Sequence, residues 1–187
     1  MSVANRMSEQ AYLELAASDP DGKWELWDGE PREKPGMSVE HSRSSFGLGV
    51  MLDPQLDPAV WEVRVEAPRA RWTERNAFIP DVAVVRRALA DEQANQPGRL
   101  EVYDVPLPLV VEIWSRSTGD YDVAVKVAAY QARGDAEIWR LHPYERSLTR
   151  WVRQADGTYA EEAFAGGTVA LAAIPGVVVD LDALFAR

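Results

Sequence analysis

Three charged residues stand in segments that are otherwise apolar. They are Asp81 in Ile-Pro-Asp-Val-Ala-Val-Val, Glu112 in Leu-Val-Val-Glu-Ile-Trp, and Lys126 in Val-Ala-Val-Lys-Val-Ala-Ala. A buried charge is costly unless it is paired or bound to a metal ion. If Asp81 and Glu112 lie on neighbouring strands, their carboxylates can share a hard cation, and Lys126 can approach the same point. These groups are the minimum set for metal-assisted hydrolysis of a phosphodiester bond.

The same residues also allow a simpler interpretation, in which Glu112 and Lys126 form a structural ion pair in the core. Asp122 precedes Lys126 by four residues on a predicted helix, so the two side chains share a face. Asp122 then either holds the ammonium group in position or forms an exposed ion pair of about 0.3–0.5 kcal/mol. The residues alone leave both interpretations open.

Other acidic and histidine residues could support such a site. His41, in Ser-Val-Glu-His, falls in the first turn of a predicted helix, where the helix N-terminus disfavours an imidazolium and favours a neutral base or ligand. Glu25 and Glu30 flank a predicted hairpin and could complete a cation shell, or could simply be solvated in this acidic segment. We take His41, Glu30 and Asp122 as supporting candidates.

The composition excludes several kinds of site. The chain has no cysteine and two histidines, which rules out disulfide scaffolds, thiolate nucleophiles and cysteine-bound zinc. A metal site must therefore be rich in oxygen ligands, which favours magnesium, calcium or manganese. The phosphate-loop, dinucleotide-binding and nucleophile-elbow motifs are also absent from the sequence.

The charge balance bears on partners and location. Twenty basic and thirty acidic residues give a net charge of -10, which opposes general affinity for a polyanion such as DNA. The segment from Glu62 to Arg87 holds six bases against four acids, so it predicts a locally basic surface. No apolar run reaches the roughly 18 residues of a membrane span, and the first ten residues do not resemble a secretory signal. We expect a cytoplasmic protein that does not bind membranes.

Periodicity and turn residues predict interleaved helices and strands. The expected helices cover residues 8–17, 38–52, 120–133 and 181–185, with Ser8 and Ser38 as N-caps of the first two and Gly134 as the left-handed cap of the third. The expected strands cover 60–67, 78–85, 107–114 and 136–141, and 107–114, the most apolar, is expected to be central. Hairpins are expected from 23 to the Pro35-Gly36 break, with a primed turn at Asp28-Gly29, and at 147–164, and a broken strand at 168–179. In the helix at 38–52, Phe46 and Val50 are expected to share an apolar face with Met51 beside them. Residues 88–106 are expected to form a long loop.

The fold class expected from this order is α/β. Alternating helices and strands predict a sheet flanked by helices, and the two hairpins require antiparallel pairs, so the sheet is expected to be mixed. A chain of 187 residues suits one domain, so we expect a single domain over 1–187 with its core at about 11–185.

The order of several short motifs resembles the Uma-two family of restriction-endonuclease-like proteins, in the PD-(D/E)xK nuclease superfamily. The matching stretches are Trp24-Glu25-Leu26-Trp27-Asp28-Gly29-Glu30, then His41, Ile79-Pro80-Asp81-Val82, Pro108 to Ser115, Asp122-x-x-x-Lys126-x-x-x-Tyr130, and Ala136-Glu137-Ile138-Trp139. With the closing Pro175-Gly176 and Leu181 to Phe185, they span about Ala11 to Phe185.

The resemblance implies a restriction-endonuclease-like core with an added hairpin region. It implies Asp81 and Glu112 as ligands of Mg²⁺, with Mn²⁺ as a substitute, and Lys126 as the catalytic lysine. In the wider superfamily the lysine lies two residues after the second acid, where this chain has Trp114. Lys126 fits a lysine that has migrated to the following helix. Ser115-Arg116 stands where the family has serine-proline.

Three functional hypotheses follow. The first is a metal-dependent endonuclease that hydrolyses DNA, with a homodimer easing the charge objection by gathering basic residues across its interface. The second is a non-catalytic binding or partner protein with the nuclease fold, in which Glu112 and Lys126 form a structural ion pair. The third is a subunit that becomes basic, or complete, only with a partner.

Overall fold

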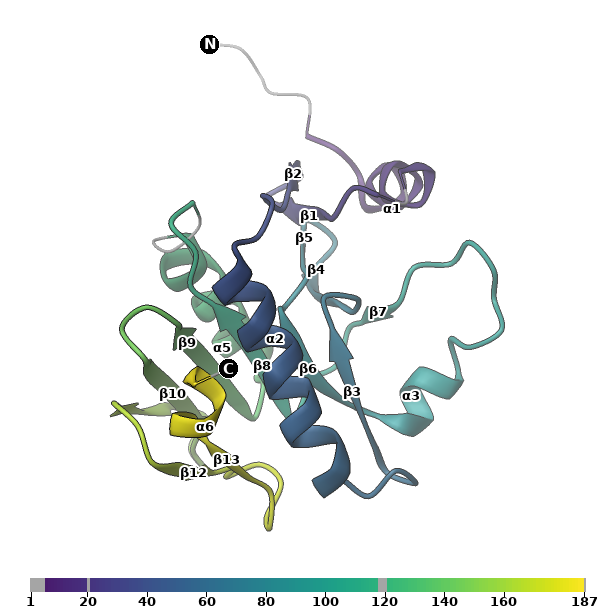
Figure 1. Ribbon diagram of the computed structural model, residues 1–187. Coiled ribbons are helices and arrows are strands. Elements are labelled where there is room, and N and C mark those ends of the chain that lie inside the picture. The colour runs from purple at the N-terminus through teal and green to yellow at the C-terminus, as the bar shows by residue number, and fades with distance from the viewer. Residues whose placement is uncertain (1–5, 20, 118–120, 187) are drawn as a thin grey trace.

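The computed structural model describes residues 6–19, 21–117 and 121–186 (Figure 1). Within these residues the chain forms a six-stranded sheet, a five-stranded sheet and a small two-stranded sheet. Helices flank the strands, so the α/β class and the mixed sheet expected from the sequence are both confirmed.

The six-stranded sheet forms the centre of the molecule. Its strand order is β11-β10-β9-β8-β6-β3, with β3 at Trp61–Val65, β6 at Val82–Arg86, β8 at Leu109–Ile113, β9 at Glu137–His142, β10 at Ser147–Arg153 and β11 at Tyr159–Phe164. Strand β8 pairs parallel with β9 and antiparallel with β6, and all five of its residues are buried. This agrees with the prediction that the most apolar strand is central.

The five-stranded sheet carries the N-terminal hairpin. Its order is β2-β1-β5-β4-β7, with β1 at Trp24–Trp27, β2 at Glu30–Glu33, β4 at Arg69–Thr73, β5 at Asn76–Phe78 and β7 at Val102–Tyr103. Asp28 and Gly29 join β1 to β2 with φ values of 49° and 79°. Positive φ at both central residues is typical of the primed turn that the Asp-Gly pair predicted.

The strand expected at 78–85 is wrong as a single element. Strand β5 ends at Phe78 in one sheet and β6 begins at Val82 in the other, so Ile79-Pro80-Asp81 is the crossing between sheets. Pro80 has no N–H to contribute to a ladder, which accounts for the break. As a result, Asp81 lies at the junction of the two sheets.

Helices lie on both faces of the six-stranded sheet (Figure 1). The helices of the described residues are α1 at Glu9–Ser18, which packs against β1 of the five-stranded sheet, α2 at Val39–Leu52, the 3-10 turn η1 at Asp53–Gln55, α3 at Arg87–Asp91, the π-helical η2 at Asp122–Val127, α5 at Ala128–Arg133 and α6 at Leu181–Phe185. Ser8 and Ser38 cap α1 and α2 through their hydroxyl groups, and Gly134 ends α5 in the left-handed region, as predicted. Helix α3 and strand β7 both enter the expected loop at 88–106, so that interval is not one long loop.

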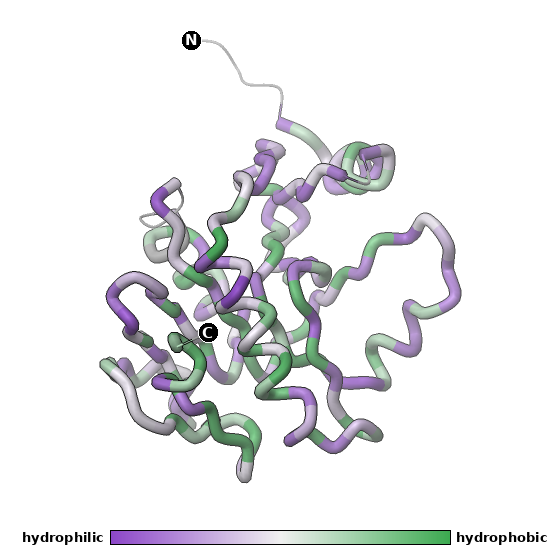
Figure 2. The backbone as a smooth tube through the Cα atoms, viewed as in Figure 1, coloured by the Kyte–Doolittle hydropathy of each residue, from purple (hydrophilic) through white to green (hydrophobic). Residues whose placement is uncertain are grey.

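The apolar side chains of β8 alternate between two hydrophobic cores. Leu109, Val111 and Ile113 pack toward α2 and α6, whereas Val110 packs toward α5. The small sheet of β12 (Thr168–Ala170) and β13 (Val178–Asp180) completes the first core. Figure 2 shows hydrophobic stretches running through the centre of the molecule.

Helix α2 presents a different face to the sheet from the one expected. Phe46 is 67% exposed and Val50 is 43% exposed, while the buried positions include Ser44, Gly47 and Gly49. Small residues allow the helix to lie close to β3, since a Cβ on Gly49 would stand 3.1 Å from Val65 Cγ2. The apolar face expected from Phe46 and Val50 therefore points outward.

Among the described residues, no helix is long and apolar enough to cross a membrane.

Candidate active site

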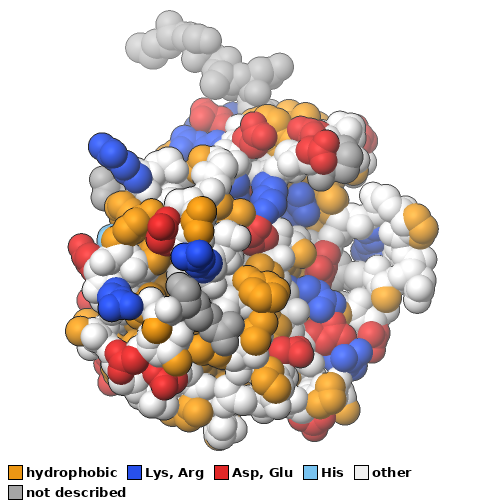
Figure 3. Space-filling model, in the orientation of Figure 1, with side chains coloured by type: hydrophobic (Ala, Val, Ile, Leu, Met, Phe, Trp, Pro, Cys, Tyr) orange, Lys and Arg blue, Asp and Glu red, His pale blue; other side chains and the backbone are white. Residues whose placement is uncertain are grey.

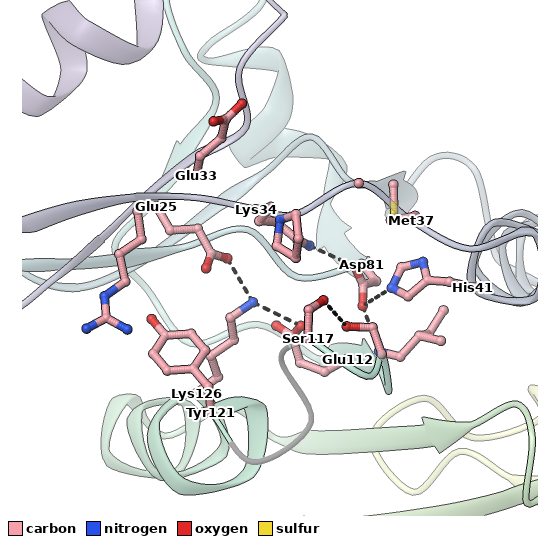
Figure 4. Close-up of a pocket in the computed structure, with 15 residues that line it drawn as sticks. Glu25, Glu33, Lys34, Met37, His41, Asp81, Glu112, Ser117, Tyr121 and Lys126 are labelled. Carbon is pink, nitrogen blue, oxygen red and sulfur yellow. Dashed lines mark hydrogen bonds and ion pairs between the residues drawn. The ribbon is translucent and has the colours of Figure 1, made fainter.

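A cavity of about 290 Å³ lies where the two sheets meet. Its lining comes from β1, the chain after β2, the start of α2, the β5–β6 crossing, β8 and η2, and includes Glu25, Lys34, His41, Asp81, Glu112, Tyr121 and Lys126. Figure 4 shows these side chains converging from both sheets. Segments far apart in the sequence thus meet at one point.

Asp81 lies directly before β6, and Glu112 lies on β8, the strand that pairs with β6. Val82 is opposite Val111 in the antiparallel β6–β8 pair, and the Asp81 backbone N–H donates to the Val111 carbonyl at 2.9 Å. Both side chains are 1% exposed. The break at Pro80 therefore brings one carboxylate beside the other at the end of the strand pair.

The Asp81 carboxylate is held by three donors. Lys34 Nζ lies 2.7 Å from Oδ1, while the Ile113 N–H and His41 Nε2 lie 2.6 Å and 3.1 Å from Oδ2. Burial alone would raise the pKa of Asp81, but the Lys34 charge and the His41 contact hold the pKa well below its usual range. Asp81 is therefore a carboxylate throughout the neutral range.

Glu112 and Lys126 belong to a second buried network. Tyr130 OH donates to Glu112 Oε1 at 2.6 Å, and Lys126 Nζ donates to Oε2 at 3.1 Å. Lys126 also pairs with Glu25 Oε1 at 2.8 Å, so its ammonium group lies between two carboxylates (Figure 4). Burial and the nearby Glu112 and Glu25 charges raise the pKa of Tyr130 well above its usual value, which keeps the phenol a hydrogen-bond donor.

The helix that carries Lys126 is irregular. Residues Asp122–Val127 form a π-helix that passes into α5. π-Helical turns inside helices are frequent at functional sites. Lys126 and Tyr130 both reach Glu112 from this helix. The Asp122 side chain lies outside the described part of the structure, so its predicted contact with Lys126 stays a prediction.

The buried groups fit a hard divalent cation. One ligand atom each from the buried His41 and Asp81 and from the half-buried Glu66 lies within 4.8 Å of the others, and Glu112, the second ligand expected from the sequence, is not part of this group. Asp81 accepts from His41 Nε2, and His41 Nδ1 is buried with no hydrogen-bond partner among the described residues. A neutral imidazole nitrogen and carboxylate oxygens are ligands that manganese and magnesium sites use.

The charge balance of the cavity points the same way. Three buried carboxylates, on Glu25, Asp81 and Glu112, face two ammonium groups, on Lys34 and Lys126. Arg32 and Glu33 add one charge of each sign, so the lining apart from His41 holds four acidic and three basic side chains. A cation near Asp81 would offset the cost of burying the excess negative charge.

Sequence reasoning missed Lys34 and Glu66. Burial alone would lower the pKa of Lys34, but Asp81 raises it above its usual value, so Lys34 is a buried cation in a segment that gave no such signal. Glu66 follows β3 with φ of 52°, a left-handed backbone that is rare for a residue other than glycine. Such strain gathers at functional sites, but it is not visible in sequence.

Glu30 does not join the other candidates. Its side chain is 53% exposed on β2, it lies 4.0 Å from Arg32, and it does not line the cavity. Glu25, on the paired strand, takes the position next to Lys126 instead. The alternation of residues in the hairpin explains the difference, because β1 directs Glu25 inward while Glu30 stands at the turn.

Comparison with known proteins supports this fold. A crystal structure described as a "putative nuclease belonging to DUF820", from Anabaena variabilis, is similar with a TM-score of 0.73 and 15% identity, over 96% of this chain and 98% of that chain. No curated protein matched the chain. The model of the Uma2 family, described as "Putative restriction endonuclease", matches residues 9–182. The chain therefore belongs to the Uma2 family, and its fold is that of a nuclease-like neighbour.

Proposed function

We propose that this protein is a metal-dependent endonuclease that hydrolyses phosphodiester bonds in DNA. The family and the nuclease-like fold support the class of activity. One observation carries the proposal: Asp81, directly before β6, and Glu112, on the adjacent strand β8, both line the cavity at the sheet junction, with Lys126 Nζ 3.1 Å from Glu112. This is the arrangement of two carboxylates and a lysine that the chemistry requires.

The proposed cation site is centred on Asp81. Asp81 and Glu112 are the ligands expected from the sequence, and His41 and Glu66 offer further donors on the Asp81 side. A bound Mg²⁺, or Mn²⁺ in its place, would stabilise negative charge on the phosphate and lower the pKa of water. The net charge of -10 makes such a cation more necessary for approach to DNA.

The protein's own groups position the reactants. Glu25 contacts Lys126 at 2.8 Å and Tyr130 donates to Glu112 at 2.6 Å, so each of the two side chains is held by a further partner. The Lys126 ammonium group is then positioned to orient a water molecule or a phosphate oxygen. Lys34 holds Asp81 in the same way, with a second contact to the Ile79 carbonyl at 2.8 Å.

The test is cleavage of supercoiled plasmid, linear duplex and single-stranded DNA with Mg²⁺, Mn²⁺ or EDTA. We expect Asp81→Asn, Glu112→Gln and Lys126→Ala each to lower the rate by about 100-fold or more. Asp104→Asn and Glu145→Gln make matched changes at exposed positions and should leave the rate unchanged. No metal-dependent cleavage by the folded wild type would contradict the proposal.

The second hypothesis is favoured by one observation as well. Lys126 is buried between Glu25 and Glu112, as a structural ion pair would be in a non-catalytic partner protein. The two functions are separated by measuring unfolding and cleavage on the same Lys126→Met variant. A large loss of stability in Lys126→Met, together with no DNA cleavage by the wild type, would favour the structural role.

A further inference from the structure

The outward face of α2 carries a regular stripe of residues. We define the α2 stripe as Val39, Arg43, Phe46, Val50 and Asp53. The spacing of four, three, four and three residues places them along one side of the helix, as in the contact seam of a coiled coil. Asp53 keeps helical angles, with φ of -51° and ψ of -48°, so it continues the stripe beyond the last residue of α2.

The α2 stripe is exposed along its length. Phe46 is 67% exposed, Val39 is 59% exposed and Val50 is 43% exposed. The opposite side of α2 packs on the sheet through Leu48 and Leu52. Helix α2 crosses the front of the molecule in Figure 1, and Figure 3 shows hydrophobic side chains on that same face. An exposed apolar strip bordered by charges is typical of a protein interface.

The charges of the stripe are opposite at its two ends. Arg43 stands ten residues before Asp53, which is about 15 Å along a helix. Among the described residues, neither side chain lies within ion-pair distance of an opposite charge, and the Arg43 charge acts on the exposed Glu40 one turn earlier on α2. The opposite charges of Arg43 and Asp53, on either side of Phe46 and Val50, form a pattern that is complementary to its own reverse.

We propose that a second copy of this chain docks on the α2 stripe with the two α2 helices antiparallel. A two-fold axis that crosses α2 at the level of Leu48 would place Arg43 beside the partner's Asp53 and Phe46 beside the partner's Val50. The symmetry would form each of these contacts twice. A parallel pair would instead bring Arg43 to Arg43 and Asp53 to Asp53. The charge pattern therefore selects both a second copy as the occupant and its direction.

The stripe is the centre of the interface and the neighbouring strand extends it. Val65 on β3 is 38% exposed and lies against α2 beside Gly49. A stable dimer buries about 800 Å² on each partner, so residues of β3 are needed together with the helix. The sequence analysis expected a homodimer, and the α2 stripe gives it a surface that does not depend on the cavity or on nuclease activity.

Sedimentation equilibrium tests the proposal. The wild type should have twice the chain mass of 20.8 kDa, and Phe46→Ser should weaken the dimer by at least about tenfold in Kd. Trp72→Ser changes another exposed aromatic residue, on β4, and should leave the dimer intact. Circular dichroism should show that each variant remains folded.

A charge swap tests the antiparallel arrangement itself. Arg43→Glu or Asp53→Arg alone should weaken the dimer by about tenfold, because each places like charges together. The double variant should return to within about threefold of the wild-type Kd, since the swapped charges again face each other. A wild type that sediments as a monomer at every concentration overturns the proposal, and a double variant no better than the single ones overturns the antiparallel pairing.

Discussion

At the scale of single residues, the site depends on buried charges whose partners are fixed. Asp81 accepts from Lys34, His41 and a backbone N–H, and Glu112 accepts from Tyr130 and Lys126. Hydrogen bonds to charged groups are among the stronger ones, and a buried charge left without a partner costs more than the bond contributes. Each of these partners can therefore be tested by its effect on stability as well as on cleavage.

Tyr130→Phe tests the support of Glu112. The change removes the hydroxyl that donates to Glu112 Oε1 at 2.6 Å and leaves the ring in place. We expect the free energy of unfolding to fall by about 1.5–3 kcal/mol, because the buried carboxylate loses a donor. Urea unfolding of the variant and the wild type measures this decrease in the free energy of unfolding. Tyr144→Phe removes a hydroxyl from a side chain that is 56% exposed and should cost less; equal losses in the two variants would contradict the prediction.

The low pKa of Asp81 predicts a dependence of stability on pH in metal-free protein. Lys34 and His41 outweigh the effect of burial and lower the pKa of Asp81 in the folded state. Below about pH 4 the unfolded chain therefore takes up a proton that the folded chain does not, and the free energy of unfolding decreases as the pH is lowered.

Comparing Asp81→Asn with the wild type checks this dependence. The stability difference between the two, measured by urea unfolding in EDTA, should be largest near neutral pH and should shrink below about pH 4. Parallel stability curves across that range would show that the Asp81 charge is not stabilised by its neighbours.

The residues that could be predicted are those whose charge conflicts with an apolar pattern. Asp81, Glu112 and Lys126 stood out for that reason, and all three line the cavity. Lys34 and Glu66 lie in polar segments, where a charge has no contrast, and they reach the site through the tertiary fold. Glu30 carried the same signal as Glu25, and only the strand register separates them.

At the scale of elements, local signals predicted turns and caps better than sheet membership. The Asp28-Gly29 turn, the Ser8 and Ser38 caps and the Gly134 terminus are set by neighbouring residues, and each was found. The division of 78–85 between two sheets depends on long-range pairing of β5 with β1 and β4, which periodicity does not report. The outward face of α2 was missed for a related reason, because its glycine and serine residues pack closely where larger apolar residues were expected.

Glu137 shows how one buried charge can join two elements. Its carboxylate accepts from Trp139 Nε1 at 2.7 Å and from the Ala172 and Ala173 N–H groups at 2.7 and 3.0 Å. These bonds attach the segment between β12 and β13 to β9. A glutamine at this position would replace one carboxylate oxygen by an NH2 group. That group is a donor and would face an N–H group that also donates.

We therefore expect Glu137→Gln to lower the free energy of unfolding by about 2 kcal/mol or more. Hydrogen exchange should also show faster opening of residues 168–180 than of β8. Glu162→Gln, at an exposed position on β11, is the matched control. If Glu137→Gln were as mild as Glu162→Gln, the carboxylate would not be what fastens this segment.

At the scale of the whole molecule, the basic segment does not form the free surface that its composition suggested. Arg64, Arg71, Arg75 and Arg87 each pair with a nearby acid, and Arg69 is buried against the Tyr12 hydroxyl. Nearby acids thus pair with four of the six bases, whereas Arg86 stays exposed over the Trp61 ring. Under the proposed function, DNA contact would depend on Arg86, on the basic groups near the cavity and on bound cations.

Arg32 is the basic side chain best placed for such contact. It lines the cavity, its guanidinium lies 3.9 Å from the centre of the Trp27 ring, and its side chain is 41% exposed. Stacking on Trp27 holds the guanidinium in one orientation while leaving its N–H groups to bind a phosphate. A single phosphate contact contributes about one to the slope of log K against log salt.

Arg32→Gln should therefore weaken DNA binding for every sequence and reduce the salt slope by about one. Fluorescence anisotropy with labelled duplex over a series of salt concentrations, with Ca²⁺ replacing Mg²⁺, measures both quantities. Arg99→Gln removes the same charge outside this cavity and should leave the slope unchanged. Because salt weakens a phosphate contact, Arg32→Gln should reduce the affinity more at low salt than at high salt. An unchanged slope would show that Arg32 does not contact phosphate.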